Sequence, residues 1–279
     1  MEVPSAVRAM STDFLQSKLG RTGMPVCRLG FSGSYRPGER TIRRALDEGL
    51  NYFFCYGFDG QTIRVLRSLN ADRREKIVIG TGAYNYIWFH QDLKRTLEKR
   101  LRQLKTDYID VFHFLGVMKP KEFTPRVREH LEALRHDGRV RAVSISCHHR
   151  KFAAQLAAEG ALDCLMARYN AAHRGAETEI FPALERHDVG MVSYTATRWR
   201  RLIQRARNWP RERPVPTAGQ CYRFVLSNPA VDVCLTAPNN ERELAENLKA
   251  VRLGPLPEDE MQILREYGDH VHRNAGWFM

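Results

Sequence analysis

Short apolar runs alternate with longer amphipathic segments along almost the whole chain, and this alternation limits the possible folds more than any other feature. Between the short runs, apolar residues recur at helical spacing, as at Leu93, Leu97, Leu101 and Leu104. Such alternation is typical of βα units with parallel strands, and eight units predict a closed (β/α)8 barrel. The predicted strands are residues 27–31, 51–55, 77–81, 108–114, 142–146, 163–167, 190–194 and 231–236.

The length of the chain fits one barrel. It has 279 residues, and a (β/α)8 barrel takes roughly 250. No linker, low-complexity segment or internal repeat divides the sequence, so we expect a single domain over residues 1–279. Ahead of the first predicted strand, residues 18–26 suggest a short hairpin with its turn near residues 21–23. We expect this hairpin to close the bottom of the barrel.

The composition is typical of a globular protein, with 43% hydrophobic and 27% charged residues. No apolar run approaches the roughly 18 residues of a spanning helix, and the start lacks the pattern of a secretion signal. We therefore expect a cytoplasmic protein without membrane contact. The six cysteines are not paired at metal-ligand spacing, which predicts buried thiols and neither a metal site nor an iron–sulfur cluster.

The net charge of +12 has two interpretations, which both stay open. A strongly basic protein attracts anions such as nucleotides or acidic metabolites, whereas an arginine-rich composition produced by genomic base bias gives only a solvated surface. Residues 198–213 hold seven arginines and two tryptophans, beginning at Arg198. They suit either capture of an anion or nucleotide or an amphipathic surface helix. No nucleic-acid-binding motif accompanies them, so we do not expect nucleic acid as a partner.

Several collinear segments resemble the aldo/keto reductase superfamily over nearly the whole chain. Each segment is weakly specific alone, but their common order and spacing indicate the family. The segments are residues 18–31 (hairpin and first strand), 45–53 (first helix and second strand), 107–111, 138–146, 169–170 and 243–247. The resemblance implies a barrel that reduces aldehydes or ketones with NADPH.

The family's catalytic tetrad is substituted at every position that the resemblance assigns. In the family a Tyr protonates the carbonyl oxygen, a Lys and an Asp tune that Tyr, and a His orients the substrate. Here the Asp position is Phe54, and the Tyr position is Asp59, or Phe58 if one residue is deleted. The Lys position is Gly82 and the His position is Leu115. None of these side chains can perform the corresponding step.

The resemblance also implies a nicotinamide cofactor site that is only partly retained. At the nicotinamide end a Ser is kept, while the family's Asn and Gln are replaced by Cys147 and Met166. The Arg that contacts the adenosine 2′-phosphate is replaced by Asn239, so a preference for NADP(H) is in doubt. We expect a weakened NADP(H) site. The predicted cofactor-binding residues are Ser146, Asn170, Tyr194, Thr195, Arg198, Asn239, Asn240, Glu243 and Asn247.

Four other side chains are candidates for acid–base chemistry. Strand alternation places His113 on the face of Leu115 but deeper in the barrel, where a hydrogen-bonded core histidine is the alternative. Tyr56 and Asp59 follow the second strand and His148 follows the fifth, at the end where barrel active sites lie. Rim positions of this kind, which also include Tyr84 and Tyr86, are often merely solvated. Adjacent His148 and His149 should point apart, and no third ligand is evident, so we expect no metal.

Three functions remain open, each with a small molecule or nucleotide as its ligand. The barrel could be repurposed, either as a non-catalytic nucleotide- or metabolite-binding protein or as an enzyme of redox-neutral acid–base chemistry. The alternative is an NADP-dependent oxidoreductase that reduces aldehydes or ketones with replacement catalytic groups. The sequence sets no oligomeric state.

Overall fold

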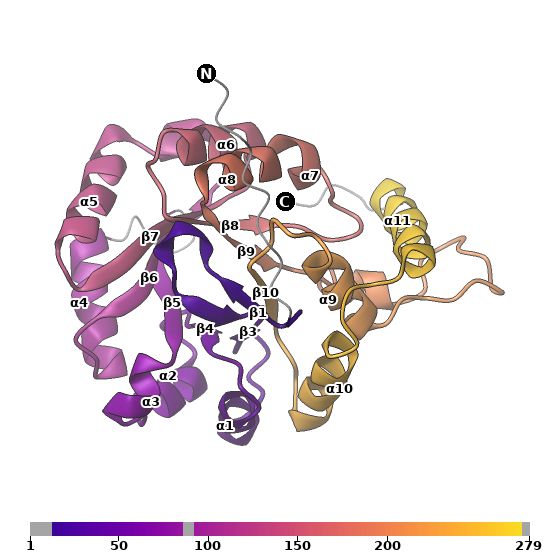
Figure 1. Ribbon diagram of the computed structural model, residues 1–279, viewed down its shortest axis with the longest axis horizontal. Helices are drawn as coiled ribbons and strands as arrows, with labels where there is room; N and C mark the ends of the chain where they lie inside the picture. Colours follow the sequence, from indigo (N-terminus) through magenta and orange to yellow (C-terminus); the bar gives the residue numbers. More distant parts are fainter. Residues whose placement is uncertain (1–12, 86–91, 275–279) are drawn as a thin grey trace.

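Eight parallel strands close into a barrel, as the alternation of strands and helices predicts (Figure 1). The structure is a computed structural model that describes residues 13–85 and 92–274. Around the barrel the strand order is β10-β3-β4-β5-β6-β7-β8-β9. These strands are β3 (Leu29–Ser32), β4 (Tyr52–Phe54), β5 (Val78–Tyr84), β6 (Ile109–Val117), β7 (Val140–Cys147), β8 (Cys164–Arg168), β9 (Gly190–Tyr194) and β10 (Val233–Thr236).

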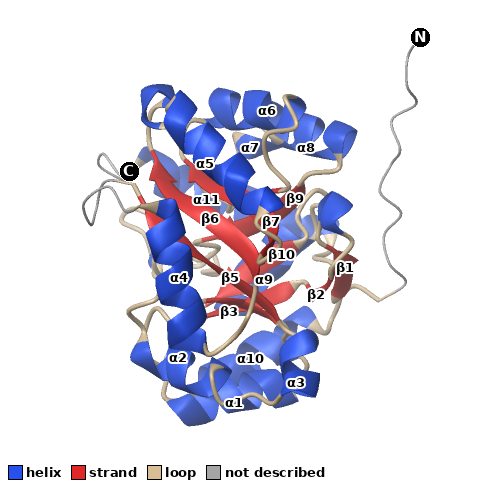
Figure 2. Cartoon of the chain, turned by 90° about the vertical axis from the view of Figure 1, so that its left-hand side faces the viewer, coloured by secondary structure: helices blue, strands red, loops and turns tan. Residues whose placement is uncertain are grey.

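The helices wrap the outside of the barrel, as Figure 2 shows. Side-chain caps fix where several of them begin: Asp92 accepts from the Arg95 N–H, and Thr217 and Gln220 form a capping box. The α-helices are α1 (Glu39–Asp47), α2 (Gly60–Leu66), α3 (Ala71–Glu75), α4 (Leu93–Leu104), α5 (Pro125–His136), α6 (Arg150–Ala158), α7 (Ala176–Glu179), α8 (Phe181–His187), α9 (Ala218–Leu226), α10 (Glu241–Val251) and α11 (Glu258–Arg273). Three 3-10 turns are η1 (Gly20–Thr22), η2 (Pro120–Glu122) and η3 (Arg201–Ile203).

The predicted hairpin is present and packs on the bottom of the barrel. Its strands β1 (Gln16–Lys18) and β2 (Pro25–Cys27) are antiparallel, and the turn between them ends at Gly23 with a φ of 68°. The hairpin side chains Leu19, Met24 and Val26 are buried with the residues that fill the barrel interior. The first barrel strand was expected to begin at Cys27, but the Cys27 backbone pairs with Gln16 of the hairpin, so the barrel strand begins two residues later.

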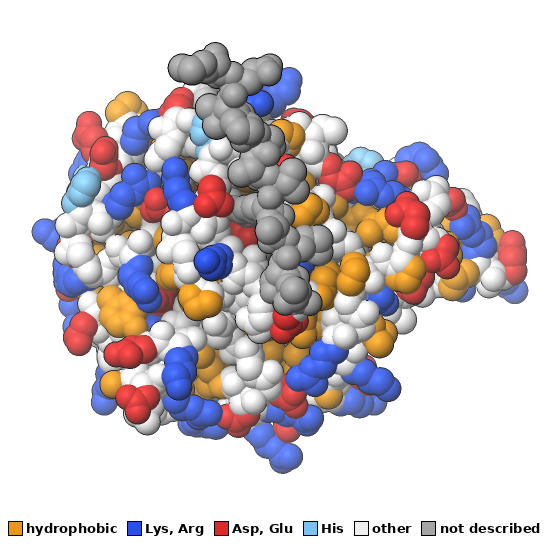
Figure 3. Space-filling view, viewed as in Figure 1, with side chains coloured by type: hydrophobic (Ala, Val, Ile, Leu, Met, Phe, Trp, Pro, Cys, Tyr) orange, Lys and Arg blue, Asp and Glu red, His pale blue; other side chains and the backbone are white. Residues whose placement is uncertain are grey.

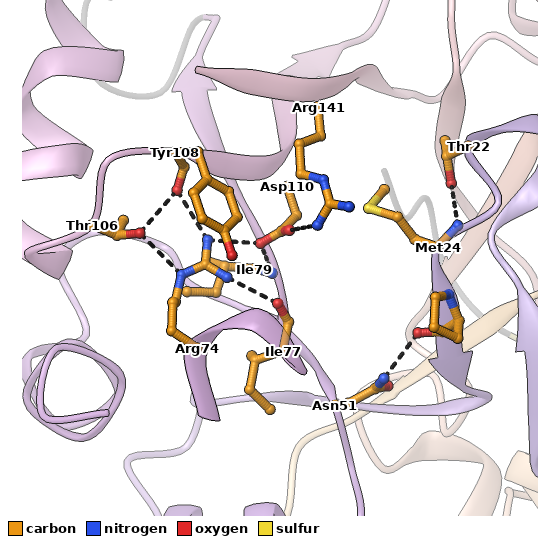
Figure 4. Close-up of polar contacts among 11 residues, drawn as sticks. Thr22, Met24, Asn51, Arg74, Ile77, Ile79, Thr106, Tyr108, Asp110 and Arg141 are labelled. Atoms are coloured by element: carbon orange, nitrogen blue, oxygen red, sulfur yellow. Dashed lines mark hydrogen bonds and ion pairs between the residues drawn. The ribbon is translucent and has the colours of Figure 1, made fainter. Parts of the chain in front are cut away.

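A buried charge cluster joins two strands at the bottom of the barrel (Figure 4). The Asp110 carboxylate is fully buried, accepts from the Ile79 N–H at 2.9 Å, and pairs with Arg74 at 2.8 Å and Arg141 at 3.0 Å. The Arg74 guanidinium also lies 4.1 Å from the centre of the Tyr108 ring. These contacts hold β5 against β6 at the end of the barrel opposite to the carboxyl ends of the strands.

Many surface arginines are paired with acidic side chains, in line with the solvated-surface interpretation of the basic composition. Figure 3 shows Lys and Arg interspersed with Asp and Glu over the hairpin face of the molecule. Among the pairs are Arg64 with Glu39 at 2.5 Å and Arg73 with Asp47 at 2.6 Å. Exposed pairs of this kind contribute little to stability.

Candidate functional site

A cavity of ≈ 450 Å³ opens among the carboxyl ends of the barrel strands. This is the end at which (β/α)8 enzymes place their active sites, and the volume suits a small-molecule ligand. Its walls are largely aromatic and apolar, with a few hydroxyl groups and one histidine. The lining residues are Ser32, Ser34, Tyr35, Phe54, Tyr56, Tyr84, Leu115, Gly116, Ser146, His148, Met166, Tyr194, Thr195, Ala196, Thr197, Trp199, Tyr222, Leu235 and Ala237.

Tyr56 brings a phenol into this cavity from the loop after β4. Its hydroxyl lies 2.8 Å from the Ser34 Oγ and accepts from the Ser32 Oγ at 3.4 Å. The Tyr56 ring meets the Phe54 ring edge to face, with 4.8 Å between their centres. Tyr56 follows Phe54 by two residues rather than the five that the family spacing implies. Counting along the sequence therefore led to Asp59 as the Tyr equivalent, although Tyr56 is the residue in this loop whose hydroxyl reaches the cavity wall.

Gly82, the position assigned to the family's Lys, has no room for a side chain. It lies opposite His113 in the β5–β6 pair, and a Cβ added there would be 1.9 Å from the His113 carbonyl oxygen. Two residues later, Tyr84 ends β5 and lines the cavity. Burial raises the pKa of the Tyr84 phenol well above its usual value. Tyr86 lies outside the described residues.

Asp59 lies behind the loop rather than among the cavity-lining residues. Its Oδ1 accepts from the Gly57 N–H at 3.3 Å and from the Cys55 thiol at 3.5 Å. Burial raises the pKa of the Asp59 carboxyl, against the effect of its hydrogen bonds. Asp59 thus shapes the loop that carries Tyr56.

His113 is buried in the barrel interior, where its Nε2 lies 3.2 Å from the Tyr52 hydroxyl. The Phe54 ring, which lines the cavity, packs edge-on against the imidazole with 5.6 Å between ring centres. Burial lowers the pKa of His113 to about 3, so the ring is neutral at physiological pH. This environment fits the hydrogen-bonded core histidine better than an acid–base group in contact with ligand.

His148 does line the cavity, and its Nε2 lies 3.2 Å from the Tyr194 hydroxyl. Burial lowers the pKa of His148, and the nearby Arg168 lowers it further. The next residue, His149, instead accepts from the Phe152 N–H at the start of α6, so the two rings have different partners. Among residues 13–85 and 92–274, no three His, Cys, Asp or Glu side chains are grouped as a metal would need.

At the predicted nicotinamide end, Ser146, Tyr194 and Thr195 line the cavity, but Asn170 does not. The Ser146 Oγ accepts from the Gly116 N–H at 3.3 Å. The Asn170 amide donates to the Thr195 carbonyl at 2.8 Å and accepts from the Ala172 N–H at 3.0 Å. Asn170 therefore joins the loops after β8 and β9.

At the predicted adenosine end, the polar side chains bond to one another around the start of α10. Glu243 accepts from the Asn239 N–H at 2.9 Å and from the Asn239 side-chain amide at 2.8 Å. Asn240 caps the helix by accepting from the Glu243 N–H at 3.0 Å. Asn247 donates to the Thr236 hydroxyl at 3.1 Å. Asn239, Asn240 and Glu243 thus fix the start of α10, and Asn247 ties the middle of the helix to the end of β10.

The basic segment does not form the amphipathic surface helix that we considered for it. Its described structure consists of turns and the short η3, because Arg198, Trp199 and Arg200 have φ values of 49°, 48° and 70°. Such left-handed residues cannot continue an α-helix. The Arg198 side chain is buried and donates to the Val271 carbonyl at 3.1 Å, whereas Trp199 is partly exposed and lines the cavity.

The remaining expectations concern the cysteines and the membrane. All six cysteines are buried free thiols, as predicted. Within the described residues, every helix is too short or too polar to cross a bilayer.

Comparisons with known proteins agree with this architecture. The profile of the aldo/keto reductase family matches residues 35–269. An uncharacterized oxidoreductase, YqkF, from Bacillus subtilis is 21% identical over 90% of this chain and 95% of its own length. The aldo-keto reductase YhdN of the same organism is 25% identical over 55% of this chain and 50% of its own length.

Solved structures show the same fold. The aldo-keto reductase AKR11C1 from Bacillus halodurans in its holo form aligns with a TM-score of 0.74 at 20% identity, over 90% of this chain and 95% of that chain. A putative aldo-keto reductase from Pseudomonas aeruginosa aligns with a TM-score of 0.69 at 21% identity, over 90% and 99% of the two chains. With the family profile spanning most of the sequence, this chain belongs to the aldo/keto reductase family.

Proposed function

We propose that this chain is a nicotinamide-dependent oxidoreductase that reduces a small, largely apolar carbonyl compound, with Tyr56 as the proton donor. The observation that carries the proposal is the Tyr56 hydroxyl on the cavity wall, held by Ser34 and Ser32. A carbonyl that accepts hydride develops negative charge on its oxygen, so it needs an acid beside it. Tyr56 supplies such an acid without the family's spacing.

The residues present fit a nicotinamide cofactor, although less completely than the family pattern. The cavity is lined by Tyr56 and Tyr84 as well as by Thr195 and Trp199, and in this proposal it receives the substrate beside the nicotinamide end of the cofactor. Tyr194 would stack on the nicotinamide ring, and Ser146 and Thr195 would bind its polar groups. When bound, the reduced cofactor supplies the hydride.

The cofactor affinity should be weaker than that of a fully equipped relative. The Asn170 amide is already committed to the Thr195 carbonyl and the Ala172 N–H. Met166 lines the cavity where the family has a Gln, and a thioether is a poor hydrogen-bond partner for a carboxamide.

The apolar walls of the cavity strengthen the interaction between the phenol and the carbonyl oxygen. Phe54, Leu115 and Met166 exclude water from the space beside Tyr56. Excluding water strengthens the hydrogen bond between the phenol and the carbonyl oxygen. Ser34 and Ser32 fix the position of the Tyr56 hydroxyl and can return a proton to it from solvent.

A second function is favoured by the same apolar positions. Phe54, Gly82 and Leu115 stand where the family has charged or titratable groups, which suits a barrel that binds a ligand without hydride transfer. His148, the cavity histidine, would then be available for redox-neutral acid–base chemistry. This is the repurposed barrel expected from the sequence.

The experiment separates these functions in two steps. NADPH and NADH are titrated against the protein by cofactor fluorescence and thermal shift, and a panel of aldehydes and ketones is then assayed for turnover. We expect binding, slow turnover, and a loss of about 10²–10⁴-fold in kcat for Tyr56→Phe. The matched control is Tyr108→Phe at the bottom of the barrel, which should keep full activity.

The other outcomes discriminate among the alternatives. Failure to bind either cofactor would overturn the oxidoreductase proposal. Binding without turnover would favour the non-catalytic role. Turnover of a metabolite without cofactor, abolished by His148→Ala, would establish redox-neutral chemistry.

A further inference from the structure

Within the described residues, four large apolar or aromatic side chains are exposed, and three of them lie around the mouth of the cavity. Tyr35 and Trp199 line the cavity and are nevertheless 42% and 46% exposed. Phe58 is 64% exposed and packs against two of the lining residues. Aromatic side chains that stay exposed at the opening of an apolar cavity are typical of a binding site.

Phe58 continues the aromatic wall of the cavity toward solvent. Its ring centre lies 5.3 Å from that of Tyr56 and 6.2 Å from that of Tyr84, and both of these residues line the cavity. The buried Arg100 of α4 donates to the Tyr56 and Gly57 carbonyls, each at 3.3 Å. Gly57 leaves room for this guanidinium, since a Cβ there would lie 1.9 Å from the Arg100 Cζ. The backbone that carries Phe58 is therefore fastened to α4.

Trp199 is held at the cavity by a backbone conformation that is unfavourable for a large side chain. Arg198, Trp199 and Arg200 have successive φ values of 49°, 48° and 70°, and a left-handed conformation costs free energy at every residue other than glycine. The buried Arg198 side chain anchors this turn by donating to the Val271 carbonyl at 3.1 Å. Backbone strain of this kind is concentrated at binding and active sites.

Tyr35 is carried by a second tight turn. Arg36 follows it with a φ of 54° and donates its N–H to the Gly33 carbonyl at 3.0 Å. Gly33 packs closely on α2, since a Cβ there would lie 2.4 Å from the Thr62 Oγ1. Both turns thus hold an aromatic ring at the opening of the cavity rather than in the core.

The exposed area of these rings suits a small ligand better than a protein partner. A large aromatic side chain has about 150–250 Å² of surface, so three half-exposed rings offer roughly 300 Å². A stable protein interface buries about 800 Å² on each partner. The cavity of ≈ 450 Å³ is shared, in the proposed function, by the substrate and the nicotinamide. A substrate with more than one ring would therefore extend onto the exposed rings.

We propose that Tyr35, Phe58 and Trp199 form an outer subsite, which binds a flat aromatic part of the substrate while its carbonyl group lies beside Tyr56. The proposal rests on the carbonyl substrate proposed above and names its class, a carbonyl compound with at least two aromatic rings. One ring lies inside the cavity and the other lies at its mouth, where stacked or edge-to-face contacts with the three side chains hold it.

The test measures binding, so it does not depend on turnover. The probe is 6-propionyl-2-dimethylaminonaphthalene, a two-ring ketone whose fluorescence shifts to shorter wavelengths in apolar surroundings. Its Kd is measured with and without saturating NADP⁺, and the Kd of the one-ring ketone acetophenone is measured by displacement. Trp199→Ala should raise the Kd of the two-ring ketone about tenfold, because it removes the largest ring of the outer subsite. The Kd of acetophenone should change by less than about twofold.

Two control variants separate the aromatic contact from general hydrophobicity. Trp199→Phe keeps a ring and should hold the Kd of the two-ring ketone within about threefold of the wild-type value. Leu253 is the fourth exposed side chain, at 69%, and it follows α10 outside the cavity lining. Leu253→Ala should leave the Kd of both ketones unchanged.

Trp199→Gly separates binding from folding. Glycine adopts the left-handed conformation freely, which offsets the lost packing of the indole, so we expect a melting temperature within about 2 °C of wild type. The variant should weaken binding of the two-ring ketone at least as much as Trp199→Ala does. A large fall in melting temperature with an unchanged Kd would assign Trp199 to stability and overturn the proposal.

Three other results would also refute the outer subsite. They are an unchanged Kd of the two-ring ketone in Trp199→Ala, an equal loss for both ketones, and failure of the wild type to bind the two-ring ketone with or without NADP⁺. An equal loss would place Trp199 beside the carbonyl group instead of at the mouth. A protein that binds the two-ring ketone through Trp199 but binds no nicotinamide cofactor would refute the proposed function and leave the outer subsite established.

Discussion

Replacing Gly82 by alanine should destabilise the barrel strongly for so small a change. The added methyl group would lie 1.9 Å from the His113 carbonyl oxygen and 2.9 Å from the His113 backbone nitrogen. Both atoms belong to strand β6, which pairs with β5 from Gly80 to Tyr84, so neither can move without loss of interstrand hydrogen bonds. Overpacking a core costs about 1–3 kcal/mol when side chains can yield. With a backbone contact we expect the upper end, about 3 kcal/mol.

The measurement is urea unfolding of Gly82→Ala, followed by far-ultraviolet circular dichroism. Gly60→Ala is the matched control, because Gly60 is the first residue of α2 and its nearest neighbour is the flexible end of Arg64 at 3.2 Å. It should change the free energy of unfolding by less than about 1 kcal/mol. A loss below about 1 kcal/mol in Gly82→Ala would show that β5 and β6 yield easily and that the steric argument is wrong.

Three other predictions follow from the structure, two for substitutions and one for cofactor binding. Asp110→Asn leaves Arg74 buried without its carboxylate, so the free energy of unfolding in urea should fall by about 3 kcal/mol. The control is Asp47→Asn in an exposed ion pair, which should lower it by less than about 0.5 kcal/mol. His113 has a folded pKa of about 3 against an unfolded value of about 6.5, so its neutral form contributes stability that is lost as pH falls between them; His113→Gln should flatten the pH dependence there. Because Glu243 would repel a 2′-phosphate beside Asn239, fluorescence titrations should give NADPH and NADH Kd values within about tenfold. A stronger preference for NADPH would contradict this placement of the adenosine end.

The fold could be predicted from the sequence because its determinants are local and repeated. In the sequence, each strand is indicated by a short run of β-branched residues. Each helix is indicated by apolar residues at helical spacing, such as Leu93, Leu97 and Leu101. Where a nonlocal contact decided the outcome, the prediction failed. Cys27 continues an apolar run into the first barrel strand, but its backbone pairs with the hairpin.

The basic segment shows the same limit of periodic patterns. Its arginines and tryptophans fit a helical stripe, yet three successive left-handed residues direct the chain into turns. Arg198 is buried and bonded to the Val271 carbonyl near the end of α11, a contact between residues far apart in the sequence. No local feature of the sequence predicts that contact.

The sequence predicted at which end of the barrel the site lies, but not which of the candidate side chains line the cavity. Tyr56 and His148 were recognised as rim residues because they follow strands, and both line the cavity. Packing between strands decides which of the deeper side chains line the cavity. The sequence therefore could not show that His113 and Asp59 lie outside the cavity lining. Arg100 was hidden within an ordinary amphipathic helix, where an arginine is expected to face solvent. Its signal is Gly57, a glycine that makes room for it.

The two ends of the barrel are stabilised by different groups, so a substitution at the carboxyl ends of the strands need not disturb the bottom of the barrel. Asp110 with its two arginines, and the hairpin held by Asn51, stabilise the bottom independently of the cavity. At the tips, Phe54 adds apolar burial over His113, and Gly82 lets β6 approach closely. A lysine restored at residue 82 alone would therefore meet the His113 backbone and force the strands apart.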